Sequence, residues 1–180
     1  MKKIFLICFV LLLLALTYSF YKEITKTKNP KRIACQEKTT TFEKINSNAP
    51  IKEAIELLKT HQYTIKSHIE YSTYMPSYLI NILTIQEANE LLEEVISSHT
   101  TQTANSAHAL LIDYYIYEND KEDKGKKNAQ AKKYAGYVVF EFKLDNQLIY
   151  KIQTDYMDID AKDLKERFSC VIESFISLEK

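Results

Sequence analysis

The sequence predicts an α+β fold with two layers. We expect an antiparallel sheet of about four or five strands with amphipathic helices packed on one face, preceded by an N-terminal membrane or signal helix. Several stretches alternate apolar and polar residues with a period of two, which is typical of half-buried strands. Others repeat apolar residues every three or four positions, which is typical of helices. The chain also begins with a long apolar run.

The N-terminal segment has two interpretations that the sequence leaves open. Lys2 and Lys3 precede thirteen consecutive apolar residues, Ile4 to Leu16, and small residues follow them, as in a secretory signal that is removed. If the segment is kept, residues 4–21 form about 27 Å of helix, close to the thickness of a bilayer core. The chain is therefore predicted to meet a membrane through residues 4–21, or to lose residues 1–19.

Charge around this segment predicts its orientation. Lys2 and Lys3 favour a cytoplasmic N-terminus and an external body, although five basic residues after the segment favour the reverse. We expect a single-pass inner-membrane anchor with its body in the periplasm, or a periplasmic or secreted protein after cleavage. The expected organisation is a signal-anchor or signal peptide at 1–21, a polar tether at 22–48 and one small α+β domain at 49–180.

Composition limits the partners and the chemistry. With 24 basic and 24 acidic residues the net charge is zero, which argues against nucleic acid as the main partner. Outside the apolar segment the cysteines are Cys35 and Cys170. In an oxidising compartment this pair could form a disulfide, which would be worth up to about 5 kcal/mol. The alternative is two unrelated thiols.

In the first half of the body, the sequence patterns that predict helices and strands differ in strength. Residues 39–45 are expected to add a short edge strand, and residues 49–61 repeat apolar positions at helical spacing. Residues 63–71 alternate cleanly between apolar and polar and predict a half-buried strand. Residues 75–83 are ambiguous and are interpreted as a hairpin partner of that strand.

The second half is more strongly patterned. Thr84 and Glu87 form a capping box that starts a helix running to about residue 99. From residue 108 the period changes to two, and further strands are predicted at 137–144 and 148–156.

The last two strands predict their own register. Joining them through residues 145–147 places the large apolar residues on one face and opposite charges on the other, so a slip of one residue would destroy both features. The predicted pairs are Leu144–Leu148, Phe142–Tyr150, Phe140–Ile152 and Glu141–Lys151. A final helix, capped by Asp158 or Asp160, is expected to run to about residue 178.

The sequence lacks the signatures of several enzyme classes. Its two glycines, Gly125 and Gly136, argue against phosphate-binding loops, which need several. The four histidines show no spacing typical of a zinc site. Cys170 could act as a nucleophile with a histidine, but no third member presents itself. We predict no cofactor, no metal site and no catalytic residues.

One acidic cluster permits a metal as an alternative. Asp155, Asp158 and Asp160 fall between the last strand and the last helix, and three carboxylates could hold Ca²⁺ or Mg²⁺. Helix N-termini attract aspartate in any case, so the capping interpretation is preferred.

Two surfaces are candidates for partner binding. Tyr115, Tyr117 and Tyr137 are predicted on the outer face of the sheet, where tyrosine also suits a half-exposed strand. A lysine-rich loop at 119–136 could contact an anion, or could simply be a solvated loop. Its candidate residues are Lys124, Lys126, Lys127, Lys132 and Lys133.

Taken together, these features predict a non-enzymatic, membrane-anchored or exported envelope protein that acts as a binding or assembly accessory. Its partner is expected to be a protein of the envelope. One alternative is a small metal-dependent or thiol enzyme of the periplasm that uses the acidic cluster or Cys170. Another is a cytoplasm-facing anchored domain that binds an acidic partner through the lysine loop.

Overall fold

The structure is a computed structural model that describes residues 17–18, 31–100, 109–125 and 133–179. Contacts group Arg32–Lys180 into one compact unit, the body, and Met1–Lys31 into another. In the ranges that the structure describes, no helix is both long and apolar enough to cross a membrane. The predicted membrane segment at 4–21 lies almost wholly outside those ranges.

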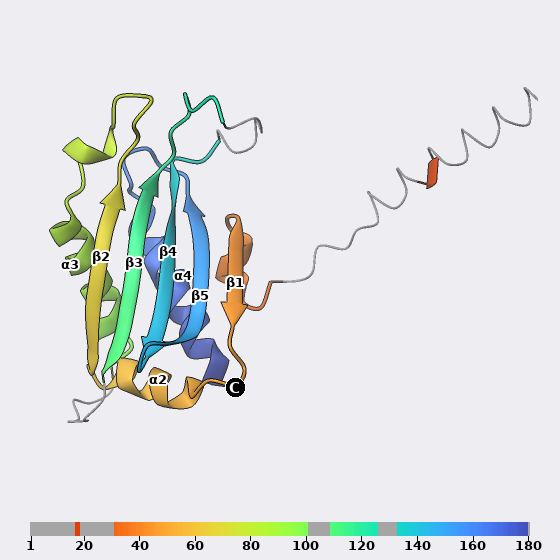
Figure 1. Cartoon of the computed structure of the whole chain (residues 1–180), viewed down its shortest axis with the longest axis vertical. Helices are drawn as coiled ribbons and strands as arrows, with labels where there is room; N and C mark the ends of the chain where they lie inside the picture. Colours follow the sequence, from red (N-terminus) through yellow and green to blue (C-terminus); the bar gives the residue numbers. More distant parts are fainter. Residues whose placement is uncertain (1–16, 19–30, 101–108, 126–132, 180) are drawn as a thin grey trace, which may run out of the picture. The chain divides into compact units, whose positions relative to one another are not determined.

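The body is an α+β fold built on a five-stranded mixed sheet with the order β1-β5-β4-β3-β2 (Figure 1). The strands are β1 (Thr41–Ile45), β2 (Tyr63–Glu70), β3 (Leu110–Glu118), β4 (Gly136–Leu144) and β5 (Gln147–Tyr156). The helices are α2 (Ile51–Lys59), α3 (Ile85–Ser97) and α4 (Leu164–Ile176), with short 3₁₀ turns η1 (Ala34–Glu37), η2 (Leu79–Asn81) and η4 (Ser177–Glu179). In Figure 1, α3 and α4 lie behind the sheet and α2 lies at its lower end.

The expectation of a fully antiparallel sheet is wrong for one strand. β2 pairs with β3 in parallel, and only the other three pairings are antiparallel. Residues 75–83 do not form a strand: they contain the turn η2 and lead into α3, which carries the chain back before β3 begins. A parallel pair needs such a crossover, whereas a hairpin at 75–83 would have reversed the chain at once.

The hairpin of β4 and β5 follows the predicted register over most of its length. The confirmed pairs are Phe140–Ile152, Glu141–Lys151 and Phe142–Tyr150. Beyond them an irregularity between Phe142 and Lys143 shifts the pairing, so Leu144 faces Gln147 and not Leu148 as predicted. The turn is correspondingly tighter than the expected three residues, with Asp145 and Asn146 both at positive φ, which suits a two-residue hairpin turn.

Helices and sheet enclose an aromatic core. Tyr114 of β3 stacks on Phe140 of β4 with ring centroids 4.7 Å apart, and Phe142 stacks on Phe175 of α4 at 4.0 Å. Phe168, also from α4, meets the Phe140 ring edge-on at 5.3 Å. Burying each such ring contributes about 1.5–3 kcal/mol before entropy is counted. The core therefore fixes α4 across the inner face of the sheet.

The predicted start is correct for α3 and wrong for α4. The capping box of Thr84 and Glu87 is confirmed at the start of α3. The predicted cap of the last helix by Asp158 or Asp160 is wrong, because α4 begins at Leu164, directly after Asp163. The Asp163 carboxylate turns back and accepts hydrogen bonds from the backbone N–H groups of residues 157 and 158, so it organises the connection before the helix.

The body begins earlier than expected, at Arg32. Residues 32–45, which we expected within the polar tether, form η1 and β1 and pack on the body. β1 is an edge strand paired with β5, in agreement with the strand expected at 39–45.

Replacing Gly136 with alanine is expected to destabilise the body by about 1–3 kcal/mol. Gly136 opens β4 between Glu118 and Tyr156, and an added Cβ would collide with the Tyr117 carbonyl oxygen and the Tyr156 side chain. Urea unfolding measures the loss. Gly125→Ala is the matched control, because its nearest new neighbour is the Asp123 carboxylate at 3.1 Å on an exposed loop. Equal stability of the two variants would contradict the close packing at Gly136.

Candidate binding surface on the open sheet face

One face of the sheet is turned away from α3 and α4 (Figure 1). The strand register places one residue from each of the five strands in a row across this face. The strand register aligns Phe42, Gln153, Val139, Tyr115 and His68 from β1 to β2. Phe42 is 62% exposed at one end of the row, whereas Val139 at its centre is only 2% exposed. Neighbouring side chains on the same face therefore shield Val139.

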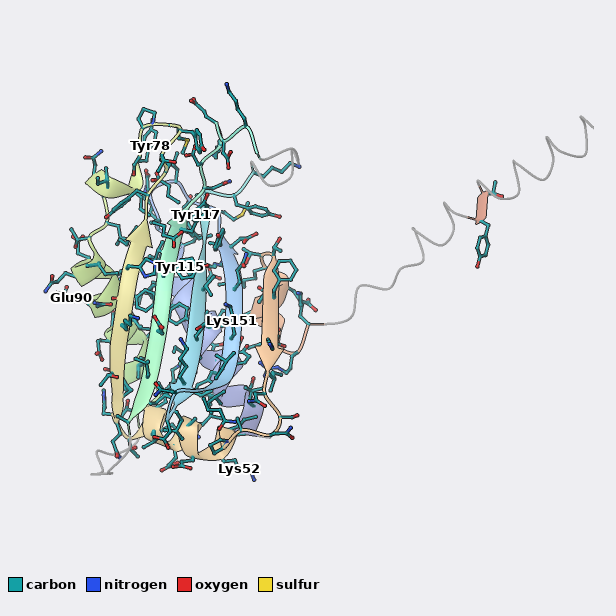
Figure 2. All side chains as sticks on the ribbon, viewed as in Figure 1. Lys52, Tyr78, Glu90, Tyr115, Tyr117 and Lys151 are labelled. Atoms are coloured by element: carbon teal, nitrogen blue, oxygen red, sulfur yellow. A yellow bond between two sulfur atoms is a disulfide. The ribbon has the colours of Figure 1, made fainter. Side chains whose placement is uncertain are left out.

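Four aromatic side chains gather on this face, and we call them the tyrosine face: His68, Tyr115, Tyr117 and Tyr137. His68 stacks on Tyr115 with ring centroids 5.3 Å apart, and Tyr117 stacks on Tyr137 at 4.6 Å. Tyr115 meets Tyr137 edge-on at 6.2 Å, which joins the two pairs. The three predicted tyrosines are thus brought together, with Tyr115 and Tyr117 labelled on the open side of β3 in Figure 2.

Burial and neighbouring groups keep the hydroxyl of Tyr137 uncharged. Burial raises the pKa of Tyr137, and the nearby Tyr115, Tyr117 and Glu70 raise it further. The Tyr137 phenol therefore remains protonated at neutral pH. The surface that results combines aromatic rings with hydroxyl groups, a combination that protein interfaces favour.

A network of ion pairs borders the tyrosine face. Lys143 Nζ lies 2.9 Å from Asp113 Oδ2 and 2.6 Å from Glu141 Oε2, and Lys151 Nζ lies 2.7 Å from Glu141 Oε1. Hydrogen bonds from Lys143 and Lys151 lower the pKa of Glu141. The charges of Asp113, Glu141, Lys143 and Lys151 are thus largely compensated by one another. The tyrosine face is the chemically distinct part of this side of the sheet.

The predicted lysine surface is described only in part. Lys124 and Lys133 are both exposed, at the two ends of the stretch 126–132. Lys126, Lys127 and Lys132 lie outside the described residues.

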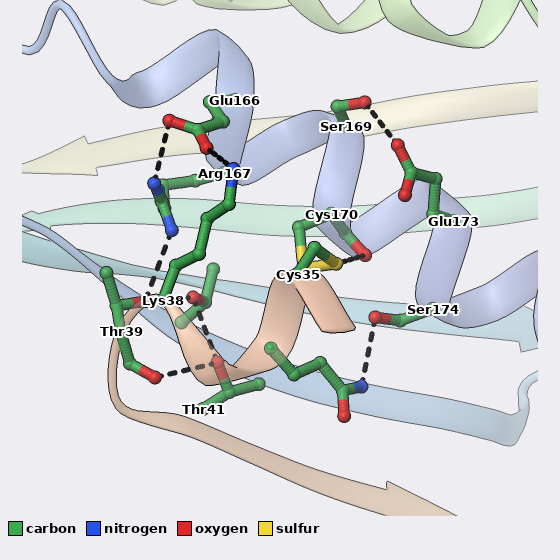
Figure 3. The surroundings of a disulfide bond; sticks show 12 residues. Cys35, Lys38, Thr39, Thr41, Glu166, Arg167, Ser169, Cys170, Glu173 and Ser174 are labelled. Carbon is green, nitrogen blue, oxygen red and sulfur yellow. Dashed lines mark hydrogen bonds and ion pairs between the residues drawn. A yellow bond between two sulfur atoms is a disulfide. The ribbon is translucent and has the colours of Figure 1, made fainter. Parts of the chain in front are cut away.

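The structure joins Cys35 and Cys170 in a disulfide, as predicted for an oxidising compartment (Figure 3). The bond links η1 to the middle of α4, across 135 residues of sequence. Lys38 forms an ion pair with Glu166 beside it. Because the Cys170 sulfur is bonded to Cys35, it is not available as a thiol nucleophile in this state.

A polar cluster that sequence reasoning missed docks the N-terminal part of the body. Arg32 Nη2 lies 2.8 Å from Glu43 Oε2 and donates to the Ser174 carbonyl oxygen at 2.7 Å, while the Tyr150 hydroxyl donates to Glu43 at 2.6 Å. Burial alone would raise the pKa of Glu43, but hydrogen bonds from Arg32 and Tyr150 outweigh it and lower the pKa. Strand alternation could have indicated this cluster, because it places Glu43 and Tyr150 on the same side of the sheet.

Two buried carboxylates that the sequence analysis also missed hold the connection between β2 and α3. Glu118, 4% exposed, accepts hydrogen bonds from the Ser77 hydroxyl and from the backbone N–H groups of Ser72, Tyr78 and Leu79. Burial acts to raise the pKa of Glu118, but these four hydrogen bonds outweigh it and lower the pKa.

Asp120 acts on the same connection. It is 3% exposed and accepts from the backbone N–H groups of Thr73, at 2.7 Å, and Tyr74. The β2–α3 connection is therefore held in place by hydrogen bonds from successive backbone groups to the end of β3.

The predicted acidic cluster is dispersed. Asp155 is 5% exposed on β5, and burial raises the pKa of its carboxyl against hydrogen bonds from Thr40 and Gln153. Asp158 and Asp160 are exposed on the connection that follows β5. Within the described ranges, no three His, Cys, Asp or Glu side chains are arranged to hold a metal ion.

Comparison with known proteins identifies no family. No family model and no curated protein matches the chain. Two solved structures of the PelC dodecamer from Paraburkholderia phytofirmans, one of them a variant, align with a TM-score of 0.35 and 8% identity. The alignments cover 77% of this chain and 94% and 96% of the two PelC chains. This similarity is too low to support an argument about the protein.

Proposed function

We propose that this chain is a non-enzymatic binding or assembly accessory of the cell envelope, which docks a protein partner on the tyrosine face. The observation that carries the proposal is the joined aromatic cluster of His68, Tyr115, Tyr117 and Tyr137 on an open sheet face. Clustered aromatic side chains with hydroxyl tips are typical anchors of protein interfaces. The partly exposed rings of this cluster would gain burial from a docked surface.

The proposed location rests on the N-terminal sequence and the disulfide. The Cys35–Cys170 bond is of a kind that persists in oxidising compartments. The apolar run that follows Lys2 and Lys3 suits export, either as an anchor through residues 4–21 or as a cleaved signal. We infer a periplasmic or external body, held at the inner membrane or released from it.

Replacing Tyr115, Tyr117 and Tyr137 together with alanine is expected to reduce partner capture by at least about tenfold, because anchors of an interface carry most of its binding energy. A photo-reactive side chain placed at Tyr115 in the wild type should give a discrete adduct in intact cells. The same group at Lys52, exposed on α2, is the matched control and should not give that adduct (Figure 2).

The double variant Tyr74→Ala, Tyr78→Ala removes two exposed tyrosines of the β2–α3 connection, which are not members of the tyrosine face, and should leave the adduct unchanged. Unchanged capture by the triple variant, with the disulfide intact, would overturn the proposal.

The location is tested by the intact mass of protein isolated from cells, with thiols alkylated before and after reduction. A full-length mass with Cys35 and Cys170 protected until reduction supports an external anchored body. Loss of about nineteen residues supports export with cleavage. A full-length mass with both body thiols alkylated before reduction would contradict the proposed location.

A further inference from the structure

Two connections carry most of the large hydrophobic side chains that are exposed. Nine such residues occur in the part of the chain that the structure describes, and six of them lie on the β2–α3 and β5–α4 connections. The six are Tyr74, Tyr78, Ile80, Ile82, Met157 and Ile159. Single exposed apolar residues are ordinary on a protein surface. Of these six, Ile82 lines the groove described below.

The backbone that presents these side chains is fixed by hydrogen bonds. Glu118 and Asp120 hold the β2–α3 connection from the end of β3, and Asp163 holds the β5–α4 connection from the start of α4. The exposed apolar residues therefore belong to ordered connections. A surface ordered in advance loses less conformational entropy when it binds.

The two connections meet α3 at a shallow groove of about 440 Å³. Its apolar lining comes from Ile82 and Leu83 of one connection, Ala161 of the other and Leu91 of α3. Ile82 is 42% exposed, so part of this apolar lining faces solvent.

Carboxylates make up the polar part of the groove. Glu87, Glu90 and Glu94 lie one turn apart along α3, and Asp160 comes from the β5–α4 connection. Figure 2 shows Glu90 on the outer side of α3. No lysine, arginine or histidine lines the groove.

These carboxylates are only partly compensated by their neighbours. Glu94 pairs with Lys165 and Asp160 pairs with Lys162, in exposed ion pairs that contribute little energy. Glu87 is held by the capping box, where the hydrogen bonds from Thr84 lower the pKa of its carboxyl. Four carboxylates against two lysines leave the groove with a negative potential.

We propose that this groove binds a cationic amphipathic segment of a partner protein. Its apolar side chains would pack on Ile82 and Leu91, and its lysine or arginine side chains would pair with Glu90 and Asp160. This is the helix-in-groove mode of recognition with complementary charge. An anionic lipid surface fits poorly, because the carboxylates would repel it.

The groove lies between α3 and its neighbouring connections, on the helix side of the sheet, whereas the tyrosine face lies on the open side. The inference therefore does not rest on the proposed function. It adds a second surface, and it makes the body able to hold two partners at once.

The test measures the affinity of a fluorescent helical peptide of leucine and lysine for the full chain in phosphatidylcholine nanodiscs. The peptide's binding signal with empty nanodiscs is subtracted. Wild type is expected to bind this peptide more tightly than a matched leucine–glutamate peptide, and less tightly as salt rises. The double variant Glu90→Lys, Asp160→Lys should bind it about tenfold more weakly. Both side chains are exposed, so the fold is expected to tolerate the change.

Glu53→Lys with Glu56→Lys on α2 makes the same charge change at another exposed helix and should leave binding unchanged. Equal affinity of wild type and the groove variant, or equal affinity for the two peptides, would overturn the inference. The groove variant leaves the tyrosine face intact, so the adduct at Tyr115 reports separately on the proposed function.

Discussion

Replacing Cys35 and Cys170 together with alanine is expected to lower the free energy of unfolding by up to about 5 kcal/mol. The bond closes a loop across 135 residues, and in the chain-entropy model loops of this length give the largest stabilisation. A loss of this size is a large fraction of the total free energy of unfolding of a small domain. The variant should therefore unfold at a much lower urea concentration. The measurement is urea unfolding of both proteins, with and without reductant.

Lys38→Ala is the matched control for the disulfide. It lies in the same segment and removes only the exposed ion pair with Glu166, so we expect a loss below about 0.5 kcal/mol. Reductant should destabilise wild type and leave the double alanine variant unaffected. An unchanged urea midpoint in the double variant would show that the bond does not stabilise the body.

Glu118→Ala is expected to cost about 3 kcal/mol. The change leaves the N–H groups of Tyr78 and Leu79 without their acceptor, and Leu79 is 1% exposed, so water cannot readily replace the carboxylate. Hydrogen exchange should rise at residues 72–79 while the β4–β5 hairpin stays protected. Glu122→Ala, an exposed acid on the following loop, is the matched control.

The Glu118 carboxylate also makes the free energy of unfolding depend on pH in a predictable direction. The pKa of Glu118 is lowered by folding, so its stabilisation is complete above the ordinary value of 4.5 and is lost as pH falls through the lowered pKa. The difference in stability between wild type and Glu118→Gln should therefore shrink in acid. A difference that grows as pH falls would contradict the hydrogen-bonded, ionised state.

Local elements of this fold could be predicted because each carries its own pattern. Alternation identified β2, β3, β4 and β5, and the capping box of Thr84 and Glu87 identified the start of α3. The register of β4 and β5 could be predicted up to Phe142–Tyr150, since apolar pairing and a charge pair agreed there. It failed beyond, because an irregularity leaves no mark in an alternating pattern.

The direction of β2 could not be predicted in the same way. Alternation reports which residues share a face, and it is the same for a parallel and an antiparallel strand. The direction follows from the crossover, which runs through residues 71–84 and α3. The path of residues 71–84 depends on Glu118 and Asp120, some 40 residues further along the chain.

The sequence does carry a weaker signal for the buried polar groups. Counting by twos from Leu110 places Glu118 on the inner face with Ile112, Tyr114 and Ile116, which marks it as a carboxylate that needs partners. For the candidate site, the same counting brought Tyr115, Tyr117 and Tyr137 together. It could not bring in His68, because that required the parallel pairing with β3.

The position of the disulfide has a mechanical consequence. The chain enters the body at Arg32, and Cys35 lies only three residues further on. A pulling force applied through the N-terminal segment would reach the bond almost at once and pass directly into α4. Without the bond the same force would act first on the hydrogen bonds of Arg32 and then on the five residues of β1, and it could peel this edge strand from β5 one hydrogen bond at a time. The cross-link would therefore keep a force applied at the N-terminal end of the body off the pairing of β1 with β5.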